Sequence, residues 1–300
     1  MLRFGTRGSA LARAQTDQIR VALESRHPGL RVEVVEIRTS GDDPGRQPLG
    51  PAGLKGLFVK EIEEALADGR IDVGVHSMKD VPAHLAPGLA IGAVPARAPA
   101  YDVLVGAVDS VAALAPGARV GTASVRRRAQ ILARRRDLAV ENLRGNVDTR
   151  LRRWRAGEFD AIVLAAAGLA RLGIAEPAAH PLPTDDFVPA VGQGALALEC
   201  RAGDTATRDR LAAIEDPVTA VAVAAERAFL VAIGGDCNTP LAAYATVTDG
   251  RVALRTLVTD PDGRRRLEEA GSAPAADAEA LGRELAARLL AAGAADILRG

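Results

Sequence analysis

Short runs of β-branched and apolar residues alternate along the chain with stretches of helical periodicity, and this alternation restricts the possible folds most strongly. The run RVEVVEIR at 31–38 alternates polar and apolar residues as a half-buried strand does. Residues 56–68 instead place apolar side chains at helical spacing. Because strands separated by helices form βαβ units, the sequence predicts an α/β fold with mostly parallel sheets.

The same criteria predict the individual elements. Strands are expected at 31–38, 71–76, 89–94, 102–107, 160–165, 195–200, 241–247 and 252–259. Helices are expected at 11–26 with Ser9 as N-cap, at 56–68, within GTASVRRRAQILARRRD at 121–137, at 218–233, and at the C-terminal end. The stretch 41–56 is rich in glycine and proline, so it is expected to form a mobile lid and no regular element.

Changes in composition predict three domains. PARAPA at 95–100 separates two βα sets, and PAVGQG at 189–194 precedes another strand, as a two-domain clamp with crossing connections requires. From about 217 a long helix, two strands joined by Asp249-Gly250 and a final helix predict a small α+β domain. We expect domain 1 at 1–95 with 195–214, domain 2 at 98–192 and domain 3 at 217–300.

Composition excludes several classes of protein. Charged residues make up 25% of the chain and the formal net charge is zero, as in ordinary globular proteins. No apolar run approaches the roughly 18 residues of a membrane span, and MLRFGTRGSA lacks the apolar core of a signal peptide, so a cytoplasmic protein is expected. Cys200 and Cys237 are too few for a disulfide framework, and no Cys/His spacing predicts a metal site.

Arginine is concentrated in one part of this neutral chain. Residues 119–155 hold twelve arginines and three acidic residues, a net charge of +9, which favours a partner with several carboxylates or phosphates. Arg126, Arg127 and Arg128 lie in the first turn of the predicted helix, where the helix dipole opposes cations, and at least two of them are expected to bind a ligand. An anion should therefore compensate them, and backbone amides with guanidinium groups would form an anion cradle at the start of the helix, whose N-cap is Thr122 or Ser124.

Other candidate residues follow predicted strands, at the sheet edge where open α/β folds bind ligands. Arg7 and Ser9 lie in the loop GTRGS between an expected first strand and the first helix. Arg144 and Arg150 flank a Gly-Asn turn after an expected short strand, although either of them could be a plain surface arginine. The run VHSMKDVP supplies the candidates His76, Ser77, Lys79 and Asp80.

The residues of VHSMKDVP alone do not decide which chemical role this run has. An aspartate beside a lysine can act as general acid or base, can stabilise a cationic intermediate, or can form a plain ion pair. His76 is expected to be a hydrogen-bonded packing residue. Cys237 follows two glycines and is expected to be the more exposed thiol, whereas Cys200 is expected to be a buried small side chain.

Taken in order, these segments resemble the hydroxymethylbilane synthase (porphobilinogen deaminase) family of tetrapyrrole, porphyrin and haem biosynthesis. The resemblance rests on GTRGSALA at 5–12, KGLFVKE at 55–61, VHSMKDVP at 75–82, GTASVRRR at 121–128, LRGNVDTRL at 143–151, AAAGLARLG at 165–173, PAVGQGALALECR at 189–201 and the cysteine loop at 234–240. Two positions depart from the usual pattern, because Asp148 and Asp236 stand where glycine is more common.

The resemblance implies two periplasmic-binding-protein-like (type II) domains around a cleft and a small third domain that carries a cysteine. That cysteine, here Cys237, would hold a dipyrromethane cofactor through a thioether. The implied transferase deaminates porphobilinogen, adds four units head to tail to the cofactor and releases 1-hydroxymethylbilane, with Asp80 as the catalytic carboxylate. The residues implied to bind cofactor or substrate are Arg7, Ser9, Lys55, Phe58, Ser77, Lys79, Thr122, Ser124, Arg126, Arg127, Arg144, Arg150, Arg171 and Gln193.

Charge and chemistry agree with this interpretation. Each pyrrole ring carries an acetate and a propionate, which suit a segment of net charge +9. Attack of a pyrrole on the azafulvene left by loss of ammonia puts positive charge on the rings, and an ionised Asp80 can stabilise it. A monomer with a small-molecule substrate is expected, without nucleic acid, membrane or metal.

Two alternatives remain open at this point. The first is a noncatalytic anion-binding module of the same bilobal fold, such as a solute receptor. The second is a nucleic-acid-binding protein that uses the arginine segment, although the eight aromatic residues offer few surfaces on which bases could stack.

Overall fold

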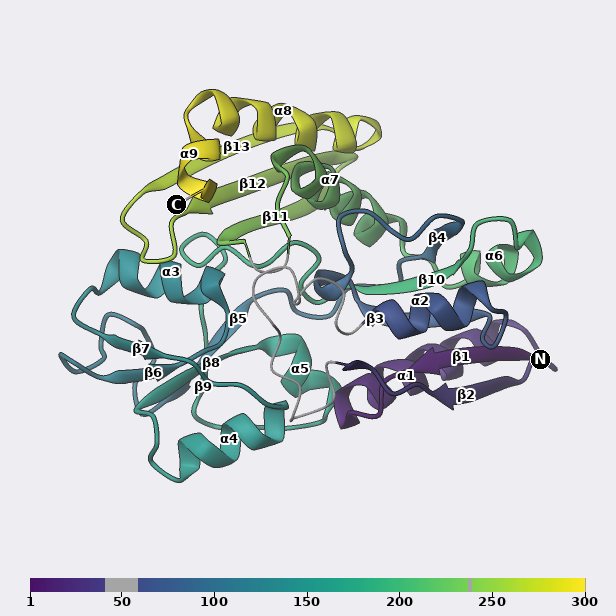
Figure 1. The fold of residues 1–300 in the computed structure, drawn as a ribbon, viewed down its shortest axis with the longest axis horizontal. Coiled ribbons are helices and arrows are strands. Elements are labelled where there is room, and N and C mark those ends of the chain that lie inside the picture. Colours follow the sequence, from purple (N-terminus) through teal and green to yellow (C-terminus); the bar gives the residue numbers. More distant parts are fainter. Residues whose placement is uncertain (41–58, 237–238, 300) are drawn as a thin grey trace. The chain divides into compact units, whose positions relative to one another are not determined.

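The computed structural model describes residues 1–40, 59–236 and 239–299, and its elements are labelled in Figure 1. The chain divides into two compact units, one made of 1–97 with 195–220 and the other of 98–194 with 221–300. The finer division into three domains stays a prediction. Within the described residues, the helices lack the combined length and apolarity that crossing a membrane requires.

The first unit is built on a five-stranded sheet with the order β2-β1-β3-β10-β4. Its strands are β1 (Leu2–Thr6), β2 (Val32–Glu36), β3 (Val73–Ser77), β4 (Leu89–Ala93) and β10 (Leu196–Arg201). β1 runs parallel to β2 and β3, whereas β10 is antiparallel to β3 and β4. The predicted strands at 31–38, 71–76, 89–94 and 195–200 are therefore confirmed, with small shifts at their ends.

Helices pack on the two faces of this sheet. α1 (Ala10–Arg26) begins at the predicted cap, because Ser9 Oγ accepts a hydrogen bond from the Ala12 amide at 3.2 Å. α1 and α6 (Thr205–Ala212) bury apolar side chains against one face, which includes Val73 and Val75 of β3. α2 (Lys60–Ala67) packs against Ile37 and Ile71 on the other face. The 3₁₀ turn η3 (Met78–Asp80) follows β3 directly.

The second unit contains a sheet with the order β7-β6-β8-β5-β9. Its strands are β5 (Asp102–Gly106), β6 (Arg119–Gly121), β7 (Ala139–Glu141), β8 (Ala161–Ala165) and β9 (Ala179–Pro181). α3 (Val125–Arg134) packs on one face of the sheet, and α4 (Val147–Arg155) and α5 (Ala166–Arg171) pack on the other. In both sheets the strand in fourth place runs antiparallel to its neighbours, the type II periplasmic-binding-protein-like arrangement.

The second unit also holds an antiparallel sheet with the order β11-β12-β13. Its elements, with the flanking helices, are α7 (Pro217–Ile233), β11 (Leu241–Thr248), β12 (Arg251–Thr259), β13 (Arg266–Pro274), η4 (Ala275–Asp277), α8 (Ala278–Ala291) and α9 (Ala294–Arg299). Asp249 and Gly250 both have positive φ, 50° and 70°, as the predicted hairpin turn requires. The expectation of two strands was wrong: β13 is a third, polar edge strand whose sequence RLEEAGSAP lacks a continuous apolar face.

Candidate functional site

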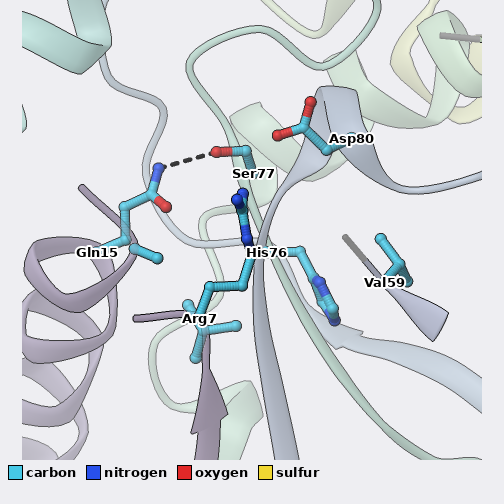
Figure 2. A pocket seen from close by; sticks show the side chains of 8 residues that line it. Arg7, Gln15, Val59, His76, Ser77 and Asp80 are labelled. Atoms are coloured by element: carbon cyan, nitrogen blue, oxygen red, sulfur yellow. Dashed lines mark hydrogen bonds between the residues drawn. The ribbon is translucent and has the colours of Figure 1, made fainter. Parts of the chain in front are cut away.

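A small pocket that opens to solvent lies at the carboxyl end of β3 in the first unit (Figure 2). The residues that line it are Arg7, Ala12, Gln15, Val59, Val75, His76, Ser77 and Asp80. Arg7 follows β1 and Ser77 ends β3, and these strands are parallel neighbours, so their carboxyl ends meet at one sheet edge. The structure thus places Arg7 of the GTRGS loop beside Ser77 and Asp80, which the sequence selected together in VHSMKDVP.

The turn η3 leaves the carboxylate of Asp80 exposed at this pocket. Met78 anchors the turn, because its side chain is 1% exposed and its amide donates to the carbonyl of Ala195 at 3.0 Å. Lys79 is half-buried beside Asp80. The Ser9 hydroxyl serves α1 as the cap described above, so the structure shows a structural partner for this predicted ligand-binding residue.

Gln15 belongs to this pocket although the sequence interpretation did not select it. Its side-chain amide is 4% exposed and donates to Ser77 Oγ at 2.9 Å, as the dashed line in Figure 2 marks. The bond fixes the Ser77 hydroxyl beside Arg7. A polar amide on the buried face of α1, among Ala12, Ile19 and others, is the signal that could have identified it.

In the second unit, Arg126 and Arg127 share the carboxylate of Asp102. Arg126 Nη2 lies 2.7 Å from Asp102 Oδ2, and Arg127 Nη2 lies 2.7 Å from Asp102 Oδ1. Gln193 donates to the same Oδ1 at 2.8 Å, and all four side chains are buried. The anion expected at the start of this helix is therefore, in the structure, a carboxylate of the protein itself. A role of these arginines toward a ligand stays a prediction.

The charges of this buried cluster are strongly coupled. Burial by itself would raise the pKa of Asp102, but Arg126 and Arg127 outweigh it and lower the pKa to about 2. Burial lowers the pKa of the Arg126 guanidinium, which Asp102 partly offsets. Ser124 caps α3 as predicted, accepting from the Arg127 amide at 3.4 Å, and Thr122 Oγ1 accepts from the Ser124 amide at 3.2 Å.

The substitution Asp102→Asn should destabilise the protein by about 3–5 kcal/mol, because it leaves two buried guanidinium groups without their carboxylate. The pKa of Asp102 is lowered from its ordinary value of 3.8 to about 2. The stabilisation is therefore complete above pH 3.8 and is lost as the pH falls through about 2. Denaturant unfolding at neutral pH and along an acid series measures both effects.

Asp137→Asn is the matched control. Arg135 and Asp137 form an ion pair with the same 2.7 Å separation, but on the surface. Solvent screens an exposed pair, so this variant should lose far less stability. Equal losses in the two variants would contradict the argument that burial makes the Asp102 cluster important.

The remaining predicted arginines of the second unit lie at different depths. Arg144 is exposed, and Arg150 is half-buried and donates through Nε to the carbonyl of Gly145 at 2.7 Å. Arg171, at the end of α5, donates through Nη2 to Gly194 O at 2.7 Å. Its Nε is buried without a hydrogen-bond partner among the described residues, and burial lowers its pKa to about 10. Arg171 therefore stays a cation at neutral pH, and its buried Nε–H has no partner among the described residues.

Three predicted features lie outside the described residues: Lys55 and Phe58, the proposed lid at 41–56, and Cys237. The other cysteine, Cys200, is fully buried on β10, as predicted, and burial raises the pKa of its thiol. Within the described residues there is no group of three or more His, Cys, Asp or Glu side chains placed to hold a metal ion.

Comparison with known families gives two matches that together cover most of the chain. The family model described as "Porphobilinogen deaminase, dipyromethane cofactor binding domain" matches residues 2–209. The model "Porphobilinogen deaminase, C-terminal domain" matches residues 220–291.

Curated relatives match over nearly the full length. The porphobilinogen deaminase of Syntrophotalea carbinolica is 52% identical, with 99% of this chain and 95% of the relative covered. That of Acidithiobacillus ferrooxidans is 50% identical, covering 99% and 97%. Among solved structures, a YaeC-family lipoprotein from Enterococcus faecalis is 12% identical with a TM-score of 0.43, covering 72% of this chain and 91% of that one.

Proposed function

The chain belongs to the porphobilinogen deaminase family, and we propose that Asp80 is the catalytic carboxylate of its reaction. The enzyme is a transferase of tetrapyrrole biosynthesis, a hydroxymethylbilane synthase. It deaminates porphobilinogen, condenses four units head to tail on a dipyrromethane cofactor and releases 1-hydroxymethylbilane. The observation that carries this function is the identity of about half of all residues over essentially the whole chain.

The pocket in the first unit supports the role of Asp80. Its carboxylate is exposed at the pocket, where Arg7 and Ser77 also lie. Arg7 can pair with a carboxylate of porphobilinogen, because a guanidinium group binds carboxylates in a forked geometry. The ionised Asp80 can then stabilise the positive charge that develops on the pyrrole rings when ammonia leaves and a new bond forms.

The cofactor fits the residues of the second unit. The half-buried cation of Arg171 has a buried Nε–H without a partner among the described residues, which suits a group that carries acetate and propionate side chains. We propose that Arg144, Arg150 and Arg171 bind carboxylates of the pyrrole chain and that Cys237 forms the thioether. The cofactor supplies the terminal pyrrole to which new units are added.

An assay of the purified wild-type protein tests this function. Intact mass spectrometry should show the polypeptide plus two linked pyrroles, and porphobilinogen should be converted to 1-hydroxymethylbilane. A bare polypeptide that binds porphobilinogen without turnover would indicate instead a noncatalytic anion-binding module.

The proposal extends to a monomeric, cytoplasmic enzyme that acts on a small molecule and not on nucleic acid. Several arginines of the segment pair with carboxylates of the protein itself: Arg126 and Arg127 bind Asp102 in the interior, and Arg155 binds Glu176 at the surface. Because these arginines are already paired, less positive charge is available to bind the phosphates of a nucleic acid than the net charge of +9 suggests. Light scattering on the purified protein measures its molar mass and so tests whether it is a monomer.

We also propose the division into domains at 1–95 with 195–214, at 98–192 and at 217–300. The two family models match residues 2–209 and 220–291, which is compatible with a boundary between the end of the first domain at residue 214 and the start of the third at residue 217. Limited proteolysis followed by mass analysis of the fragments tests the proposed boundaries.

A further inference from the structure

A buried pair of ionisable side chains, His76 and Glu199, lies directly behind the pocket. His76 is the residue before Ser77 on β3, and the two side chains point to opposite faces of the sheet because side chains alternate along a strand. Ser77 faces α1, where it meets Gln15. The His76 ring points away from Ser77 toward Val59, as Figure 2 shows.

The strand register explains how the pair forms. On β10, Glu199 is paired with Gly74 and Ala197 with His76, so Glu199 is the diagonal neighbour of His76 on the same face. A Cβ atom at Gly74 would lie 2.8 Å from His76 Nε2 and 2.7 Å from Ile62 Cγ2. Glycine at position 74 therefore leaves the space in which the imidazole reaches Glu199.

The contact is close and almost completely removed from water. His76 Nε2 lies 3.0 Å from Glu199 Oε2, and the side chains are 3% and 1% exposed. Burying two ionisable groups carries a desolvation penalty that an apolar pair of similar volume does not have. Packing alone therefore does not explain why a histidine and a glutamate, and not two apolar residues, occupy these positions.

A third ionisable group extends the pair toward the segment after Asp80. Glu63 of α2 is half-buried, and burial, followed by the charge of Glu199, raises its pKa. Glu63 Oε1 accepts a hydrogen bond from the Ala86 amide at 3.3 Å. The segment that carries Asp80 is thus held before the turn by the strand of His76 and after the turn by Glu63.

We propose that His76 and Glu199 are positioning residues that hold the end of β3, and with it Ser77 and Asp80, in the geometry that catalysis requires. The pair links β3 to β10 behind the turn, because His76 lies two residues before Met78, whose amide donates to the carbonyl of Ala195 just before β10 begins. The contact between the two side chains fixes the orientation of the turn η3 more tightly than the backbone pairing of β3 with β10 does alone. The inference rests on the proposed role of Asp80.

The double variant His76→Leu with Glu199→Leu tests the proposal, because it removes both ionisable groups together and leaves neither one unpaired in the core. For enzyme that carries the cofactor by intact mass, kcat should fall by about tenfold to a hundredfold. KM should change by less than about twofold, since Arg7 is untouched. If the leucine pair fails to fold, the pair His76→Gln with Glu199→Gln replaces it, with the same expected result.

Asp72→Asn is the matched control. Asp72 precedes β3 and pairs with Arg201 at the end of β10 at 3.0 Å, so it joins the same two strands away from the pocket. This variant should lose thermal stability and keep the kcat of the wild type. Wild-type kcat in the leucine or glutamine pair would overturn the positioning role. Wild-type kcat in Asp80→Asn would instead overturn the proposed function.

Discussion

Asp80→Asn is expected to retain the fold and the cofactor and to lose nearly all turnover. The amide is isosteric with the carboxylate but carries no charge, so it cannot stabilise the positive charge that forms on the pyrrole rings. Removing a preorganised electrostatic contact of this kind costs about a hundredfold to a thousandfold in rate. Steady-state turnover of porphobilinogen measures the loss, and intact mass verifies that the cofactor is present.

The exposure of Asp80 makes this variant informative. Its side chain is at the surface of the pocket, so asparagine there should hardly change stability. Asp17→Asn on the exposed side of α1, where Asp17 pairs with Arg20, is the control and should keep full activity. Turnover above about a tenth of the wild type in Asp80→Asn would exclude the electrostatic role.

Many of the regular elements could be predicted because their signals are local, whereas the short α5, β9 and α6 were not expected. The alternation of RVEVVEIR identified β2, and Ser9 identified the start of α1. β13 was missed because its exposed side chains alternate with half-buried ones and supply no continuous apolar pattern. An edge strand of this kind forms through its pairing with β12, which a local pattern does not reveal.

The candidate site could be predicted where its residues belong to a recognisable loop or run, as Arg7 of GTRGS does. VHSMKDVP identified Ser77 and Asp80, but their neighbours come from other elements. Gln15 lies 62 residues from Ser77, and Asp102 lies 24 residues before Arg126 on β5. The sequence predicted that an anion must accompany the first-turn arginines, yet a ligand and an internal carboxylate satisfy that requirement equally well until the register of β5 against β8 is known.

The same limit applies to His76. The sequence predicts a packing residue at this position, because a lone histidine in a buried strand usually has a structural partner. Its partner, Glu199, becomes visible only when β10 is placed antiparallel beside β3. Strand order, which depends on contacts between distant segments, therefore decides which buried polar residues belong to a functional site.

Cys237→Ser is expected to give a folded protein with the mass of the bare polypeptide and no turnover of porphobilinogen. A thioether requires a nucleophilic sulfur, and a serine hydroxyl does not replace the thiolate. The chain has two cysteines, and Cys200 is unsuited because it is fully buried and burial raises the pKa of its thiol. Intact mass before and after the substitution measures the loss of two pyrroles.

Cys200→Ala is the control for this experiment. The Cys200 sulfur lies in the core beside Gly92, so alanine should cost some stability and leave the cofactor in place. The two substitutions therefore separate the loss of an attachment point from the loss of core packing. Retention of two pyrroles in Cys237→Ser, or their loss from a folded Cys200→Ala protein, would assign the cofactor to a different residue and remove the proposed role of the 234–240 loop.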